Sequence, residues 1–229
     1  MKKCSPASNQ LLDNPPVLIS HLDHQIELLS EQVVFLPKHS ALVLSDVHLG
    51  KATTFQAHGL PVPEGDDAAD LARITQLVDQ TKAQQLIIAG DLLHSPSGVS
   101  PALISKLETW MSQCLAKITL VLGNHDQRAL RAYAMESVSS LELDGIHIVH
   151  DPADITQDFS ICGHLHPVIR VKDNSRRRLR TACFWLSEKT LVLPSFGTFT
   201  GGHPIKPAAG DRVFAPLNGR VVELPPTFY

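Results

Sequence analysis

Short apolar segments of this chain are followed, one after another, by side chains that can bind a metal ion. Asp46-Val-His48 follows residues 41–44, Gly90-Asp91 follows 86–89, Gly123-Asn124-His125-Asp126 follows 118–122, His150 follows 146–149, and Gly163-His164-Leu165-His166 follows 159–162. Apolar runs of this length are typical of buried strands, and ligands at strand ends can converge on one edge of a sheet. The pattern therefore predicts one site assembled from distant parts of the chain.

The donor atoms of these clusters are carboxylate and amide oxygens and imidazole nitrogens, without a thiolate. Such donors suit Mn²⁺, Fe or Zn²⁺ better than they suit a structural zinc held by cysteines. A single cluster indicates little, because a D-x-H pair occurs by chance and His150 alone is an ordinary histidine. The alternative for the whole set is a series of polar strand ends with no shared purpose, but the ordered set favours a metal centre.

The order D-x-H, GD, GNHD, H, GHxH over residues 46–166 resembles the signature of the calcineurin-like metallophosphoesterases. The resemblance implies an α/β (α+β) sandwich, in which two β-sheets pack face to face with flanking helices. It implies that a first divalent metal ion is held by Asp46, His48, Asp91 and His166. It implies that a second is held by Asp91, Asn124, His150 and His164, with Asp91 bridging. His125 would then protonate the leaving oxygen.

Physical chemistry agrees with these implied roles. A carboxylate has two oxygens and can bridge two cations about 4 Å apart, whose mutual repulsion a shared anion reduces. Both cations lower the pKa of a shared water, so a bridging hydroxide can attack phosphorus near neutral pH. Asn124 adds no charge, and the site stays cationic enough to attract a phosphate. We expect two Mn²⁺ ions, with Fe or Zn²⁺ as alternatives.

His94 stands three residues after Asp91, where phosphoprotein phosphatases of this superfamily carry an aspartate. The motif G-D-L-x-H resembles the repair-nuclease branch and disfavours a Ser/Thr protein phosphatase. An imidazole there could orient His125 or contact a phosphate, which makes His94 a second candidate catalytic residue. The alternative is a solvent-facing loop histidine.

Two basic features are candidates for substrate binding. Lys51 lies just after the first ligands and could meet a substrate phosphate, or could cover apolar surface with its stem. Six of the eleven residues at 170–180 are basic, and Arg176, Arg177 and Arg178 are adjacent. Clustered arginines at a hairpin tip could follow a DNA backbone, or could only keep a solvated hairpin soluble.

Three further segments resemble a narrower group, the ligase-associated DNA-damage-response phosphoesterases. They are Leu49-Gly50-Lys51 and residues 60–65 and 193–202. This resemblance implies DNA as substrate, endonuclease action, and a DNA ligase, an exonuclease and a helicase as partners in repair. One departure is Asp151, where many superfamily members have a small residue; it either tunes the second metal or caps a turn.

The predicted function is thus a DNA-repair-associated, dinuclear-metal phosphodiesterase with nuclease activity. The alternative within the same class is a small-molecule phosphoesterase that acts on nucleotides or lipid-linked diphosphates, which would not need the basic strip. A metal-free scaffold of the same fold is disfavoured, because such scaffolds lose ligands and this chain keeps every expected one.

Composition sets the remaining expectations. The 229 residues, 43% hydrophobic and 19% charged, suffice for one sizeable domain, which we place at 16–229 after a flexible tail at 1–15. The net charge of −3 means that any nucleic-acid surface must be local. Four scattered cysteines fit a reduced cytoplasm, and no apolar run reaches the roughly 18 residues of a membrane span.

The secondary-structure pattern predicts a strand pair within residues 17–36, a loop at 50–65 and helices at about 67–82 and 100–115. The second half is predicted to be rich in strands, including one continuous strand at 180–186 and a hairpin turn at Asn218-Gly219.

Overall fold

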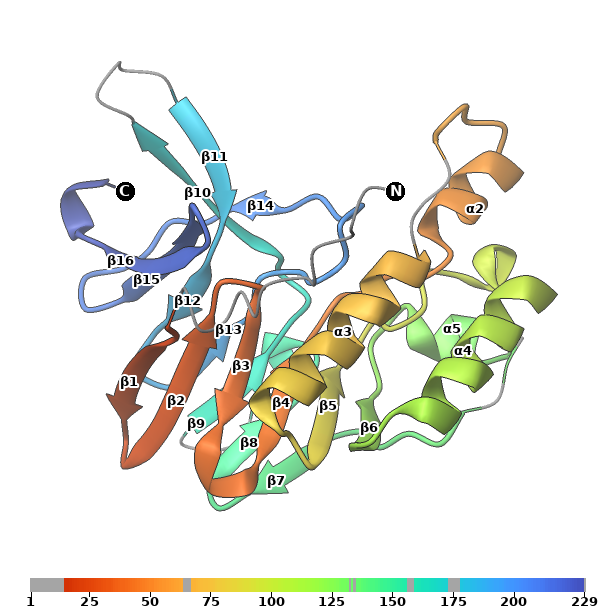
Figure 1. Cartoon of the computed structure of the whole chain (residues 1–229). Coiled ribbons are helices and arrows are strands. Elements are labelled where there is room, and N and C mark those ends of the chain that lie inside the picture. The colour runs from red at the N-terminus through yellow and green to blue at the C-terminus, as the bar shows by residue number, and fades with distance from the viewer. Residues whose placement is uncertain are drawn as a thin grey trace, which may run out of the picture.

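Two large β-sheets form the body of the protein (Figure 1), and the computed structural model describes residues 15–63, 67–131, 133, 135–155, 159–172 and 178–228. The first sheet has the strand order β1-β2-β3-β4-β5-β6. Its strands are β1 (Val17–His21), β2 (His24–Leu29), β3 (Val33–Leu36), β4 (Ala41–Leu44), β5 (Gln85–Ala89) and β6 (Lys117–Val121).

The second sheet has the order β16-β15-β12-β13-β9-β8-β7. Its strands are β7 (Leu141–Leu143), β8 (Ile146–Ile148), β9 (Phe159–Cys162), β12 (Phe184–Leu186), β13 (Thr190–Val192), β15 (Arg212–Leu217) and β16 (Arg220–Leu224). A smaller sheet, ordered β11-β10-β14, contains β10 (Pro167–Lys172), β11 (Arg178–Ala182) and β14 (His203–Pro204).

The helices are short segments between these strands. The α-helices are α2 (Lys51–Ala57), α3 (Asp67–Thr81), α4 (Pro101–Gln113) and α5 (Asp126–Ala129), and the 3-10 helices are η1 (Pro37–His39), η2 (Pro96–Gly98), η3 (Pro152–Asp154) and η4 (Pro226–Phe228). No helix among the described residues is both long and apolar enough to cross a membrane.

The main core lies between the two large sheets. Val43 and Ile87 of the first sheet share one buried cluster with Ile161 and Phe214 of the second. The neighbouring residues of the same strands point the other way, so Leu44 and other strand side chains pack with α3 and α4 in a separate cluster. Strands buried on both faces explain why the sequence shows continuous apolar runs rather than alternation. The predicted sandwich of two face-to-face sheets is confirmed, with α3 and α4 covering the outer face of the first sheet (Figure 1).

Parallel strands set the position of the site. β4, β5 and β6 run parallel in the first sheet, and β8, β9 and β13 run parallel in the second. The ligand clusters follow the carboxyl ends of β4, β5, β6, β8 and β9. Because the two sheets stack face to face, these ends gather at one edge of the sandwich.

Three predictions of secondary structure are wrong. Residues 17–36 form three strands rather than two, and the loop predicted at 50–65 begins with helix α2. Gly50, at φ 76°, starts this helix, and within it only Ala52 and Thr54 are buried, so its sequence carries almost no apolar periodicity. The strand predicted at 180–186 is divided at the buried Cys183 between β11 and β12, which belong to different sheets.

Other predictions are confirmed. α3 and α4 occupy the expected segments, and the Ser100 hydroxyl caps α4 by accepting from the Leu103 amide at 3.2 Å. Asn218 and Gly219, both at positive φ, join β15 to β16 as a hairpin. The predicted tail at 1–15 lies outside the described residues except for residue 15.

Candidate metal centre

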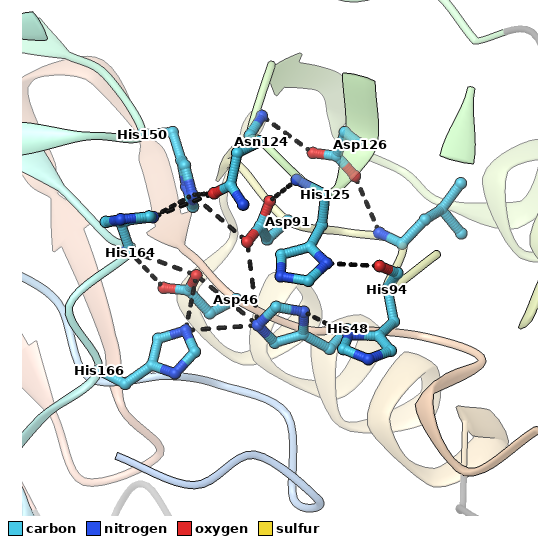
Figure 2. Close-up of polar contacts among 12 residues, drawn as sticks. Asp46, His48, Asp91, His94, Asn124, His125, Asp126, His150, His164 and His166 are labelled. Atoms are coloured by element: carbon cyan, nitrogen blue, oxygen red, sulfur yellow. Dashed lines mark hydrogen bonds and ion pairs between the residues drawn. The ribbon is translucent and has the colours of Figure 1, made fainter. Parts of the chain in front are cut away.

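Ligands from opposite ends of the ligand-bearing segment meet in a first group (Figure 2). Asp46 Oδ1 lies 3.0 Å from His166 Nε2, although 120 positions of sequence separate the two residues. His48 Nε2 is 3.3 Å from His166 Nε2 and 4.0 Å from Asp91 Oδ2. Donor atoms at such separations can share one cation at ligand distances of about 2.0–2.3 Å.

A second group lies on the other side of Asp91. His150 Nε2 is 3.3 Å from Asp91 Oδ2 and 3.1 Å from Asn124 Oδ1. His164 Nδ1 is 3.0 Å from Asn124 Oδ1 and 3.2 Å from His150 Nε2. All seven residues expected as metal ligands are therefore brought together, and Asp91 lies between the two groups.

Backbone carbonyls fix the imidazole tautomers in a way that suits metal binding. His150 Nδ1 lies 3.0 Å from the Ala89 carbonyl oxygen, and His166 Nδ1 lies 3.2 Å from the Gly201 carbonyl oxygen. A carbonyl oxygen only accepts, so each Nδ1 carries the proton and donates it. In the neutral ring, Nε2 then presents a lone pair to the cluster, as is usual for metal-bound histidines. The donor set therefore fits divalent cations.

The pKa values of the buried ligands His48 and His150 are shifted in opposite directions. Burial lowers the pKa of His48 to about 3, so its ring stays neutral. Burial alone would also lower the pKa of His150, but the Asp91 carboxylate raises it to about 9. Burial acts to raise the pKa of Asp91, yet its bond to His150 leaves that pKa lowered overall. In the protein without a cation, His150 therefore carries a proton on Nε2, at the position where a cation would bind.

Backbone strain concentrates at the same residues. Five of the seven ligands have positive φ, a region that side chains other than glycine rarely adopt: Asp46, His48, Asp91, His164 and His166. Two glycines allow the loops to approach closely. A Cβ on Gly90 would lie 2.1 Å from His150 Nδ1, and a Cβ on Gly123 would lie 2.1 Å from Asp91 Oδ1. The surrounding structure thus holds the ligands in conformations that an isolated loop would not keep.

His125 is adjacent to both ligand groups. Its backbone amide donates to Asp91 Oδ1 at 2.9 Å, and its Nδ1 donates to the His94 carbonyl oxygen at 2.5 Å. The ring lines the large cavity over the ligands. This arrangement leaves Nε2 as the ring nitrogen that can exchange a proton with a bound substrate.

His94 is partly buried against the site, so the alternative of a solvent-facing loop residue is wrong. Its ring stacks on that of His125, with centroids 4.8 Å apart and planes 18° from parallel. Its Nδ1 lies 3.4 Å from His48 Nδ1. Burial, with the nearby His125, lowers the pKa of His94 to about 4, which keeps this ring neutral.

Asp126 has a structural role that the sequence did not reveal. Its carboxylate is fully buried and accepts from the Leu93 amide at 2.9 Å and from the Gly123 amide at 3.1 Å. Burial raises the pKa of this carboxyl to about 6. Asp126 therefore joins the loop after Asp91 to the loop that carries Asn124. The only sequence signal was its place at the end of GNHD.

The predicted substrate residues are only partly placed by the structure. Lys51 begins α2, is partly buried, and lowers the pKa of both His48 and His94, so its charge acts on the site. Arg176 and Arg177 lie outside the described residues. Arg178 is placed by its backbone alone, paired with Lys172 at the end of β11. Their roles in substrate binding stay predictions.

Asp151 caps a turn, as one of its two expected roles requires, whereas its effect on the second metal stays a prediction. One oxygen accepts from the Ala153 amide at 2.8 Å and caps η3, and the other lies 3.8 Å from His164 Nε2. The carboxylate can therefore favour a proton on that nitrogen and leave His164 Nδ1 free to bind a cation.

A cavity of about 680 Å³ opens over the ligands. One side is formed by Asp91, Asn124, His125, His164 and His166, and the other by Leu165, Trp185, His203, Pro204, Ile205 and Lys206. Apart from Leu165, which belongs to the Gly163–His166 cluster, the second group was not predicted from the sequence, because its residues lie in or beside β12 and β14, which carry no ligand pattern. The cavity leaves room for a substrate directly beside the ligand cluster.

This sandwich, with its nitrogen and oxygen ligands at one edge, defines a phosphoester hydrolase that binds divalent metals. Residues 39–188, more than half of the chain, match the model of the calcineurin-like phosphoesterases, and the chain belongs to that family. The expected fold and family are confirmed.

Two known proteins are similar to this chain over most of its length. Pseudomonas putida nuclease MPE, whose crystal structure is known, has 33% sequence identity to this chain. The two structures superpose with a TM-score of 0.76, and the match covers 91% of this chain and 100% of that chain. A cAMP/cGMP dual specificity phosphodiesterase of Mycobacterium tuberculosis is 27% identical over 186 residues, which cover 76% of this chain and 52% of the relative. The chain thus spans about half the length of this curated relative.

Proposed function

We propose that this protein is a dinuclear-metal phosphodiesterase that cleaves DNA. The observation that carries the proposal is the position of Asp91 between two ligand groups, each of which adds three further donors. Asp46, His48 and His166 complete the first site, and Asn124, His150 and His164 complete the second. Mn²⁺ is the proposed metal, with Fe or Zn²⁺ as alternatives.

Divalent cations held there would neutralise charge on the phosphoryl oxygens and lower the pKa of the attacking water. The remaining steps belong to the chain's own residues. His125 presents Nε2 to the cavity and gives its proton to the leaving oxygen, since its Nδ1 is committed to the His94 carbonyl. His94 holds the ring of His125 by stacking, which makes it a positioning residue. Lys51 adds a positive charge at the side of the site occupied by His94.

The choice of a phosphodiester is supported by both relatives. One is named a nuclease and the other a cyclic-nucleotide phosphodiesterase, so the bond named in both cases is a phosphodiester. DNA is favoured because the match to the nuclease covers almost all of this chain. A role in cytoplasmic DNA repair beside a DNA ligase, an exonuclease and a helicase extends this proposal, and endonuclease action is the expected mode.

A second candidate is hydrolysis of small nucleotides, favoured by the curated relative's name. A substrate panel separates the two candidates. Metal-loaded protein is assayed with bis(p-nitrophenyl) phosphate, p-nitrophenyl phosphate, cyclic AMP, a single-stranded oligonucleotide and plasmid DNA. The proposal expects faster cleavage of diesters than of the monoester, together with cleavage of DNA. Turnover of cyclic AMP without any cleavage of DNA would support the second candidate instead.

A further inference from the structure

The segment at residues 203–206 lies between two cavities. The cavity over the ligands and a smaller one of about 320 Å³ share Pro204, Ile205 and Lys206 as lining residues. The smaller cavity is also lined by Arg170 of β10. We call the surface formed by Arg170, Trp185 and residues 203–206 the β14 groove. It leads from the metal ligands toward the hairpin β10–β11, which extends beyond the sandwich in Figure 1.

Trp185 gives this groove a fixed aromatic surface. Its indole Nε1 donates to Asp211 Oδ2 at 2.8 Å, and that oxygen also accepts from the Ala208 amide at 2.8 Å. The ring is partly exposed and lines the cavity that contains His164 and His166. An aromatic ring that is held on one side and open on the other is suited to stacking against an unpaired base.

The charges beyond Trp185 are positive. Lys206 and Arg170 are both exposed, and they line the smaller cavity together. Arg170 lies directly opposite Arg180 in the antiparallel register, where like charges destabilise a strand pair. Arg180 donates to the Gly202 carbonyl, in the loop whose neighbouring Gly201 accepts from His166. In a chain of net charge −3, this concentration of cations beside the ligands favours an anion with several charges.

We propose that the β14 groove binds one strand of a nucleic acid next to the phosphate that is cleaved. The adjacent base stacks on Trp185, and the next phosphate along the strand contacts Lys206 and Arg170. A cavity of about 680 Å³ lies within the range of pockets that hold a molecule of nucleotide size. A single strand is the expected form, because its bases are free to stack on Trp185, whereas a base of a duplex would first have to leave its pair. This inference rests on the proposed function and specifies the form of the substrate, a single strand of nucleic acid.

Binding is tested with the metal-loaded full chain and a fluorescein-labelled phosphorothioate oligothymidylate, which keeps its charges and resists cleavage. Fluorescence anisotropy is measured over a range of salt concentrations for the native protein and for Arg170→Gln/Lys206→Gln. Each lost phosphate contact lowers the log–log salt slope by about 0.7 for a single strand, so the double variant, which loses the one phosphate that both side chains contact, should lose about 0.7. Lys117→Gln is the matched control, because Lys117 is exposed at the opposite end of β6 from the ligands and should leave the slope unchanged.

The stacking contact is tested separately with Trp185→Leu and Trp185→Phe. Loss of one stacked base corresponds to roughly a tenfold or larger loss of affinity, whereas phenylalanine, which keeps a ring, should recover much of it. Both variants lose the bond to Asp211, so the difference between them reports on stacking rather than on that bond. Equal affinity of the two, or a salt slope in the double variant equal to that of Lys117→Gln, would overturn the inference.

These binding measurements do not depend on turnover. Native protein that binds the oligonucleotide through the β14 groove but hydrolyses no phosphodiester would contradict the proposed function and leave the groove as a binding site. Native protein that cleaves DNA, with unchanged binding in all groove variants, would support the proposed function and reject the groove.

Discussion

The imidazole of His125 stacks on that of His94 and donates its Nδ1 proton to the backbone carbonyl of the same residue. A single residue therefore fixes both the tautomer and the orientation of a ring that lines the cavity over the ligands. The contact connects the loop after β5 to the loop after β6, at the edge where the ligands meet.

His125→Ala should keep its metal content and lose turnover. The His125 ring lies edge-on to the ring of His48, with centroids 5.1 Å apart, but the bond to Asp91 comes from the backbone amide, which the variant keeps. Removal of a general acid lowers rates by about 10²–10⁴-fold. The loss should be smaller for bis(p-nitrophenyl) phosphate than for an oligonucleotide, because p-nitrophenolate leaves without a proton. Steady-state kinetics on both substrates, with metal analysis of the same sample, provide the measurement. A variant that loses a metal ion would show that His125 is a ligand instead.

Asp91→Asn should fold but lose activity by several orders of magnitude. The amide has the shape of the carboxylate but not its charge, and the charge is what two neighbouring cations need between them. Circular dichroism checks the fold, and metal analysis should show a marked loss of bound metal. Full activity with an unchanged metal content would show that Asp91 does not bridge two metal ions.

Asp126→Asn should destabilise the protein without changing any ligand. The buried carboxylate accepts two backbone amides, and an amide group in its place must turn an N–H toward one of them. An unsatisfied buried donor costs about 1–3 kcal/mol in the free energy of unfolding. Denaturant unfolding measures this change, and Asp79→Asn, on an exposed position of α3, is the control. Equal stability of the two variants would contradict the assigned role.

The stability of the metal-free protein should be greatest near pH 6.5. The pKa values of His48 and His94 are lowered in the folded state to about 3 and about 4, so the unfolded chain binds more protons below pH 6.5 and stability falls as the pH drops toward these values. The pKa of His150 is raised to about 9, so its contribution is complete below pH 6.5 and is lost as the pH rises through 9.

Thermal unfolding of metal-free and metal-loaded protein across this range tests the prediction. Metal binding replaces the proton on His150, so the loss of stability on the alkaline side should disappear in the loaded protein and metal affinity should rise with pH. Metal affinity that is independent of pH between 6.5 and 9 would show that His150 carries no proton in the metal-free site.

The ligands could be predicted from the sequence because each follows an apolar strand, and parallel strands place their carboxyl ends at one edge. Asp46 and His166 follow β4 and β9, which belong to different sheets, so their meeting also requires the two sheets to stack. The resemblance to the family, rather than strand order, implied that they share one ligand group. Helix α2 could not be predicted in the same way, because its few buried residues give no periodic pattern.

Trp185 and Lys206 could not be assigned to the site from the sequence, for a different reason. They reach the cavity only through the pairing of β12 with β13 and of β10 with β14, which no local pattern specifies. Asp126 was visible as part of GNHD, but its partner Leu93 lies 33 positions away, and only the folded chain shows that it joins two loops rather than binds a cation.

The most direct test of the account is the number and position of metal ions in crystals of the protein grown with Mn²⁺. Anomalous diffraction at an X-ray energy just above the manganese absorption edge locates each ion independently of any assumption about ligands. The account predicts two peaks, one beside Asp46, His48 and His166 and the other beside Asn124, His150 and His164, with Asp91 between them. A single peak at full occupancy, or two peaks of which only one contacts Asp91, would contradict it.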